Sequence, residues 1–171
     1  MFDWAAAANC LHRVAKTQVG RFLDCPEVAG VYGVGFFCDA YDGSVYLVAN
    51  TEEYHQSHLR EFQARFGPTD PEVFRWDIGN WKHPGGLFPS SAAAQVEFDA
   101  AWEEYRGPLS GMEDDKKQAK IEEVCGAVLA LLLKEGAFST ASGLKGFTVL
   151  GPDDRHEGVL GKRLLLDRLS Q

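Results

Sequence analysis

The sequence contains few of the motifs that mark an enzyme or a cofactor-binding protein. It has no Cys-x-x-Cys pair, and its four cysteines are spaced too unevenly for a zinc knuckle or a short disulfide framework. It has no GxSxG nucleophile elbow and no GxxxxGK(S/T) phosphate loop, and its GVYGVG run differs in order from GxGxxG. We therefore expect buried, reduced thiols and no bound cofactor.

Basic residues and long apolar runs are also scarce. Lys and Arg number 17 against 25 Asp and Glu, which gives a formal net charge of -8, whereas a nucleic-acid-binding face is basic. The longest wholly apolar run, AVLALLL at residues 127–133, is far too short to span a bilayer. Polar residues interrupt the apolar stretch that opens the chain, unlike a secretory signal. We expect a cytoplasmic protein that binds neither nucleic acid nor membrane.

The remaining composition is that of an ordinary globular domain. Hydrophobic residues make up 45% and charged residues 25% of the 171 residues. At this length a single domain buries about two-thirds of the surface that its unfolded chain exposes. We predict one domain over residues 1–171. Its acidic surplus suits a basic protein partner, although the same charge can serve solubility alone.

The apolar periodicity predicts helices and strands that occur in clusters. Two β-rich runs flank the Asp42-Gly43 pair, which is a strong signal for a hairpin turn. The order of elements predicts an α+β fold, in which a small antiparallel sheet with an N-terminal hairpin packs against several helices. The predicted helices cover residues 3–23, 51–66, 91–105 and 114–135, the predicted strands cover 30–39, 44–50 and 146–151, and 160–170 forms a terminal helix or strap.

Strand alternation divides the side chains of the first strand between two faces. In a regular strand Tyr32, Val34, Phe36 and Cys38 share one face. Gly33 lies on the other face, together with the glycine at position 35. Two glycines on one face leave room for another backbone or helix to approach closely.

Residues 67–91 are predicted to form a long irregular loop that is rich in Pro and Gly. Four of the seven prolines lie in this segment, and its apolar residues show no sustained period. Such a loop inside a compact domain is often functional. It can equally be a strap that covers the sheet, anchored by its aromatic residues.

The stretch LVANTEEYHQSHLREF, residues 47–62, combines two carboxylates with two imidazoles and has two interpretations. In the first, Asn50 caps a helix and places Glu53 at the third helical position, a variant of the capping box. Both glutamates then meet the positive end of the helix dipole. The residues of this structural motif are Asn50, Thr51, Glu52 and Glu53.

The second interpretation is a small enzyme or metal-binding protein. It is built around Glu52, Glu53, His55 and His58, to which the loop can add His83, and its alternative metal ligands are Glu52, His55 and His58. Residues three apart drift around a helix, so they form a poorer ligand face than the His-x-x-x-His spacing of metalloproteases. We therefore expect no metal site and favour a protein without catalytic activity.

The segment RWDIGNW, residues 75–81, places an arginine and an aspartate beside two tryptophans. Trp and Arg dominate the energetics of protein interfaces. Alternatively, both indole rings are buried against the sheet and use their N–H groups to hold the strap. The candidate partner-binding residues are Asp39, Tyr41 and Asp42 at the hairpin tip, and Asp70, Glu72, Arg75, Trp76, Asp77 and Trp81 in the predicted loop.

The order of these segments resembles an uncharacterised bacterial family, domain of unknown function 4303. The resemblance implies a small, single-domain cytoplasmic protein similar to the immunity proteins that neutralise toxins, with no established catalytic residue. It thus implies a non-enzymatic protein-binding module whose partner is a protein such as a toxin domain. The tail GKRLLLDRLS departs from the Arg-Leu-Asn-Pro type of ending in that family. The matching residues are Asn50, Thr51, Glu52, Glu53, Arg75, Trp76, Trp81, Gly136 and Phe138.

Overall fold

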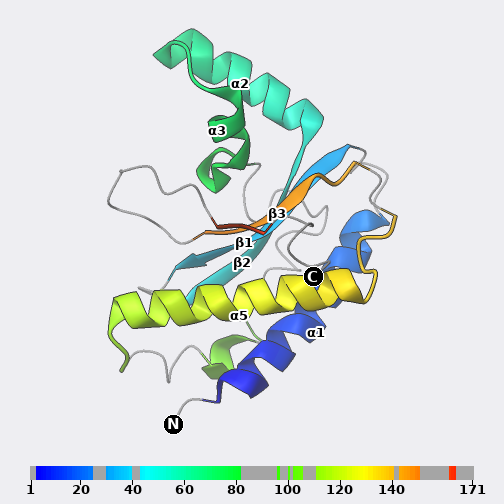
Figure 1. Ribbon diagram of the computed structural model, residues 1–171, viewed down its shortest axis with the longest axis vertical. Helices are drawn as coiled ribbons and strands as arrows, with labels where there is room; N and C mark the ends of the chain where they lie inside the picture. Colours follow the sequence, from blue (N-terminus) through cyan, green and yellow to red (C-terminus); the bar gives the residue numbers. More distant parts are fainter. Residues whose placement is uncertain are drawn as a thin grey trace.

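A computed structural model describes residues 3–24, 30–39, 43–81, 96, 100, 102–105, 111–140, 143–150 and 162–164. Figure 1 shows a sheet with α1 and α5 on one side and with α2 and α3 on the other. The elements, in chain order, are α1 (Trp4–Leu23), β1 (Val31–Asp39), β2 (Ser44–Thr51), α2 (Glu52–Phe66), α3 (Pro71–Trp76), η2 (Ile78–Asn80), α5 (Asp114–Lys134), β3 (Gly146–Leu150) and β4 (Lys162–Leu164).

The sheet has four strands in the order β2-β1-β3-β4. β1 and β2 form an antiparallel hairpin in which Asp39 lies opposite Ser44. Gly43, at the end of the turn, has a φ of +73°, a left-handed conformation that glycine adopts without strain. The predicted α+β class with an N-terminal antiparallel hairpin is confirmed. β3 pairs with β1 in parallel, because the chain crosses over through helices before it returns to the sheet.

Two helices have the terminal residues that their sequences predict. The Asp3 side chain accepts a hydrogen bond from the backbone N–H of Ala6 at 3.0 Å and so caps α1. After α5, Gly136 has a φ of +72°, and its N–H bonds the carbonyl of Leu133 at 2.9 Å. This arrangement satisfies carbonyls that the end of a helix otherwise leaves without partners.

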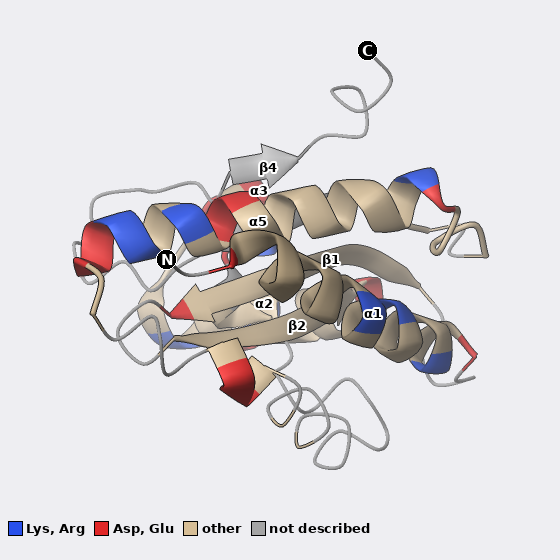
Figure 2. Ribbon diagram, turned by 90° about the horizontal axis from the view of Figure 1, so that it is seen from below, with Lys and Arg blue, Asp and Glu red and all other residues tan. Residues whose placement is uncertain are grey.

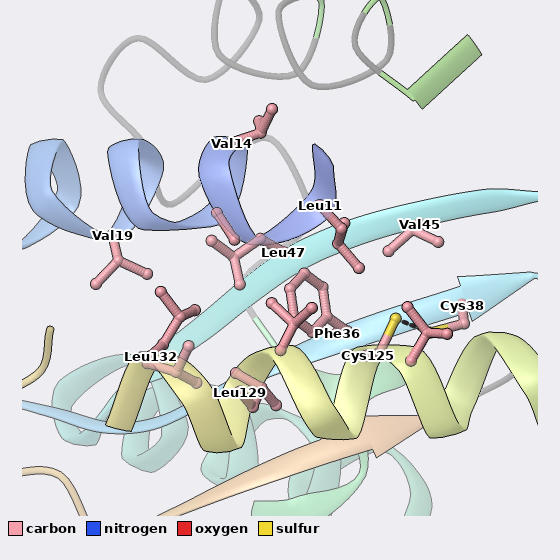
Figure 3. Packing of buried hydrophobic residues seen from close by; sticks show 14 of the residues in the cluster. Leu11, Val14, Val19, Phe36, Cys38, Val45, Leu47, Cys125, Leu129 and Leu132 are labelled. Atoms are coloured by element: carbon pink, nitrogen blue, oxygen red, sulfur yellow. Dashed lines mark hydrogen bonds between the residues drawn. The ribbon is translucent and has the colours of Figure 1, made fainter. Parts of the chain in front are cut away.

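The main hydrophobic core lies between the sheet and the pair of helices α1 and α5. Figure 3 shows Leu11 and Val19 of α1 and Leu129 and Leu132 of α5 in the layer between the helices and the sheet, where the Phe36 ring of β1 also lies. All five side chains are at most 1% exposed. Burial of one such side chain stabilises the fold by about 1.5–3 kcal/mol.

A β-bulge changes which residues of β1 face this core. The register between β1 and β2 shifts between Val31 and Gly33. As a result Val31 joins the main core together with Val34, whereas Tyr32 belongs to a cluster on the other face. The predicted grouping of Tyr32 with Val34 was therefore wrong, because an extra residue in one strand reverses the alternation on one side of the bulge.

The second face of the sheet is covered by two tryptophans that lie against glycines. Gly33 of β1 and Gly146 of β3 are register partners. A Cβ at Gly33 would lie 2.9 Å from the Trp81 ring, and a Cβ at Gly146 would lie 2.9 Å from the Trp76 ring. The predicted close approach at glycine occurs at Gly33, and the approaching groups are indole rings.

Within the predicted loop over residues 67–91, residues 71–76 and 78–80 form short helices, so the prediction of an irregular segment was wrong for this described part. Asp70 accepts hydrogen bonds from the N–H groups of Glu72 and Val73, and Pro71 occupies the first position of α3. Proline at that position loses no helical hydrogen bond, so it begins a helix here. The 3-10 turn η2 follows, and residues 82–90 lie outside the described part of the chain.

Two further predictions fall mostly outside the described residues. Of the predicted helix over 91–105, residues 96, 100 and 102–105 are described and helical, and Trp102 donates a hydrogen bond to the Gly43 carbonyl at 2.7 Å. Of the predicted helix or strap over 160–170, residues 162–164 form β4, so a helix there was wrong. Among the described helices, none combines the length and apolar character needed to cross a membrane.

Candidate functional site

Arg75 of α3 joins that helix to the first turn of α2. Its two terminal nitrogens donate to both carboxylate oxygens of Glu52, at 2.7 and 2.8 Å, and its Nε lies 3.3 Å from Glu72. The guanidinium carbon lies 4.6 Å from the centroid of the Tyr32 ring. Arg75 holds the pKa of Glu52 down at about 2, with Lys145 contributing further. The Arg75 side chain is only 10% exposed, and each of its guanidinium nitrogens has a partner within the fold.

Tyr32 connects this ion pair to the hairpin through hydrogen bonds. Its hydroxyl donates to the Arg75 carbonyl at 2.8 Å and accepts from the Asn50 side-chain amide at 2.9 Å. Trp81 Nε1 donates to the same carbonyl at 2.7 Å. Burial raises the pKa of Tyr32 above its usual range. The Arg75 carbonyl and the Tyr32 hydroxyl thus connect β1, β2 and the segment that runs from α3 to Trp81.

The interpretation of Asn50 as the cap of α2 was wrong by one residue. Thr51 is the cap, because its hydroxyl accepts from the Tyr54 N–H at 3.2 Å. Asn50 is 1% exposed, and its amide is held by Tyr32 on the second face of the sheet. Glu53 is therefore at the second helical position, and its place in the predicted capping box is lost.

The glutamate and histidines of α2 do not converge on a common point. His55 is 1% exposed and packs against Tyr32, with ring centroids 5.7 Å apart, whereas His58 stacks on Tyr54 at 5.4 Å. Within the described residues, no group of three or more His, Cys, Asp or Glu side chains is placed to hold a metal ion. His83, the loop residue of that hypothesis, lies outside them.

His55 is nevertheless an unusual residue in this network. Its Nε2 is buried and has no hydrogen-bond partner among the residues that the structure describes. Burial, followed by the positive charge of Arg75, lowers the pKa of the imidazole. A neutral imidazole is compatible with this aromatic environment, whereas a protonated one would place a second cation beside Arg75.

Both tryptophans of the RWDIGNW segment are core residues. Trp76 is 7% and Trp81 2% exposed, and they pack with Tyr32 and Val48 on the second face of the sheet. This burial and the hydrogen bond of the Trp81 indole agree with the second interpretation of the sequence, in which the rings are buried against the sheet. Neither ring is available as a surface anchor for a partner.

The exposed part of α3 carries the candidate functional surface. Asp70, Glu72 and Asp77 are exposed, and Val73 beside them is 50% exposed. Asp77 accepts from the Gly79 N–H at 3.0 Å and from the Asn80 side chain at 2.8 Å. Asp70 is engaged as the helix cap and Glu72 lies 3.3 Å from Arg75 Nε, so each of the three carboxylates has a partner within the fold. We refer to Asp70, Glu72, Val73 and Asp77 as the α3 surface.

A second exposed apolar residue lies at the end of α2. Phe66 is 64% exposed, and its ring contacts Phe62 at 4.9 Å, which in turn contacts Phe74 of α3 at 5.0 Å. α2 extends beyond the sheet at this end (Figure 1), which leaves the Phe66 ring in solvent. The sequence did not show that Phe66 and Val73 are exposed, because the helical period of apolar residues does not indicate where a helix extends beyond the sheet.

The charged residues are distributed unevenly over the described elements. Figure 2 shows basic residues on α1, and this helix contains Arg13, Lys16 and Arg21 but no acidic residue. The charged residues of the α3 surface, in contrast, are all acidic. At the hairpin tip Asp39 is half-buried, and Tyr41 and Asp42 lie outside the described residues. The α3 surface is thus the described site where predicted partner-binding residues are exposed together.

The comparisons with known proteins give no match for this chain among protein-family models, curated proteins or solved structures.

Proposed function

We propose that this protein is a non-enzymatic, cytoplasmic protein-binding module that binds a basic protein through the α3 surface. The observation that carries this proposal is the half-exposed Val73 among three exposed carboxylates. An apolar contact within a charged rim is the usual composition of a protein interface. The acids of the rim would attract a cationic partner and increase the rate of association.

The attachment of α3 to the sheet supports this role. Phe74, Arg75 and Trp76 are buried on the inner side of the same helix that exposes Glu72 and Val73. A surface held in this way loses little conformational freedom when a partner binds. The helix is therefore suited to present its carboxylates in one geometry.

The partner in this proposal is a bacterial toxin domain, which makes the protein an immunity protein. The resemblance of the NTEE and RW segments to an immunity-like family supports this assignment, as does the net charge of -8. A toxin that acts on an anionic substrate has a cationic active site, and an acidic surface can occlude such a site.

The test is an affinity pull-down of the tagged protein with the products of neighbouring toxin genes as candidate partners. Glu72→Lys and Val73→Lys each change one exposed residue of the α3 surface. Glu123→Lys makes the same charge change as Glu72→Lys, at an exposed position on α5. We expect the first two variants to weaken binding at least tenfold and Glu123→Lys to leave it within twofold.

Two outcomes would contradict the proposal. One is that no candidate toxin and no other protein of the native cell binds the wild-type chain in stoichiometric amount. The other is that Glu72→Lys and Val73→Lys bind the toxin as tightly as Glu123→Lys does. Circular dichroism of each variant separates a lost contact from a lost fold.

A further inference from the structure

Two cysteines in the main core are placed to react with each other. Cys38 of β1 and Cys125 of α5 are free thiols whose Sγ atoms lie 3.3 Å apart, although the residues are 87 positions apart in sequence. Both side chains are 0% exposed. Figure 3 shows the two sulfur atoms facing each other between the strand and the helix.

We propose that Cys38 and Cys125 are a redox-active pair, which hydrogen peroxide converts into a disulfide that links β1 to α5. An S–S bond is about 2.05 Å long, so the sulfurs, now 3.3 Å apart, have to approach by about 1.3 Å. We expect rotation of the two short side chains to provide this movement. The inference is independent of the α3 surface, which lies on the other side of the sheet.

The reaction proceeds in two steps. In the first, one deprotonated sulfur attacks an oxygen of hydrogen peroxide, the O–O bond breaks, and a sulfenic acid and hydroxide are formed. In the second, the other sulfur attacks the sulfenic sulfur, the S–S bond forms and the S–O bond breaks. The two thiol protons leave in water, so one peroxide and two thiols give one disulfide and two water molecules.

The fold makes this reaction slow and selective. Burial raises the pKa of the Cys38 thiol, and the neighbouring Cys125 sulfur raises it further, whereas the thiolate is the reactive form. We expect peroxide to reach the two buried thiols through brief local opening of the fold. Once one sulfur is oxidised, its partner is already within contact distance, so closure of the disulfide outcompetes further oxidation.

The experiment treats the folded wild-type protein with hydrogen peroxide at neutral pH. Remaining thiols are then alkylated in denaturant, and the protein is digested without reductant and analysed by mass spectrometry. We expect a peptide pair joined through Cys38 and Cys125 that is two hydrogen atoms lighter than the sum of its reduced peptides. Because the bond closes a long loop, the oxidised protein should melt about 5–10 °C higher than the reduced one.

Cys125→Ala is the matched control, and its melting temperature should no longer respond to peroxide or to a reductant. If that variant does not fold, Cys125→Val fills more of the same space, and the peptide analysis of the wild type decides independently. The proposal is overturned if Cys38 and Cys125 remain thiols while the protein is folded. It is also overturned if they become sulfinic acids or pair with other cysteines.

Discussion

Gly33→Ala tests whether the indole rings on the second face of the sheet leave no room for a side chain. The new Cβ would lie 2.9 and 3.1 Å from two atoms of Trp81 and 3.2 Å from Trp76. Both rings are buried, and Trp81 is held by its hydrogen bond to Arg75. Overpacking of this kind costs about 1–3 kcal/mol, offset by about 0.4–1 kcal/mol because alanine restricts the unfolded chain.

The expected net loss for Gly33→Ala is therefore about 1–2 kcal/mol in the free energy of unfolding. Gly146→Ala should cost less, because its Cβ would have one contact at 2.9 Å and the next at 3.5 Å. Urea denaturation followed by tryptophan fluorescence measures both, with the slope unchanged if only stability is affected. Gly111→Ala is the control, since nothing lies within 4 Å of its Cβ. A Gly33→Ala midpoint equal to or above that of Gly111→Ala would refute the close packing.

Two further predictions concern the Arg75 network. Arg75→Lys should lower the free energy of unfolding by about 1–2 kcal/mol, because an ammonium cannot reproduce the paired hydrogen bonds to Glu52; an unchanged urea midpoint would contradict this. Stability should also decrease between pH 7.5 and 5.5. The lowered pKa of His55 means that the unfolded chain takes up the proton first, so the stability present above the ordinary value of about 6.5 is lost as the pH falls below it. His55→Phe should be less sensitive to pH in this range, and an equal pH dependence of the two proteins would exclude His55 as the cause.

The parts of the fold that local chemistry determines could be predicted from the sequence. The hairpin follows from an Asp-Gly pair between two alternating runs, and α1 follows from a capping Asp3 before an apolar period. The parallel pairing of β3 with β1 could not be predicted, since it depends on where a long crossover returns the chain. Helix α3 was missed because six residues are too few to show a period.

The candidate site was less predictable because its residues compete for the same roles. Asn50 and Thr51 are both good helix caps, and the Tyr32 hydroxyl decides between them by taking the Asn50 amide. Tyr32 itself reaches that position only because of the bulge in β1. Likewise, Arg75 and the tryptophans have the composition of an interface, yet each has a partner inside the fold.

The two sides of α3 explain why Arg75 and Trp76, residue types that are common in protein interfaces, occur in this segment but are buried. Arg75 and Trp76 attach the helix to Glu52 and to the glycines of the sheet, and the same helical turn directs Glu72 and Val73 outward. If the α3 surface binds a partner as we propose, a substitution on the inner side of the helix weakens binding only by loosening the helix, with a loss of stability. A substitution at Val73 would weaken binding with stability unchanged. Measuring the loss of binding affinity and the loss of stability for each variant therefore distinguishes residues that hold α3 in place from residues that contact the partner.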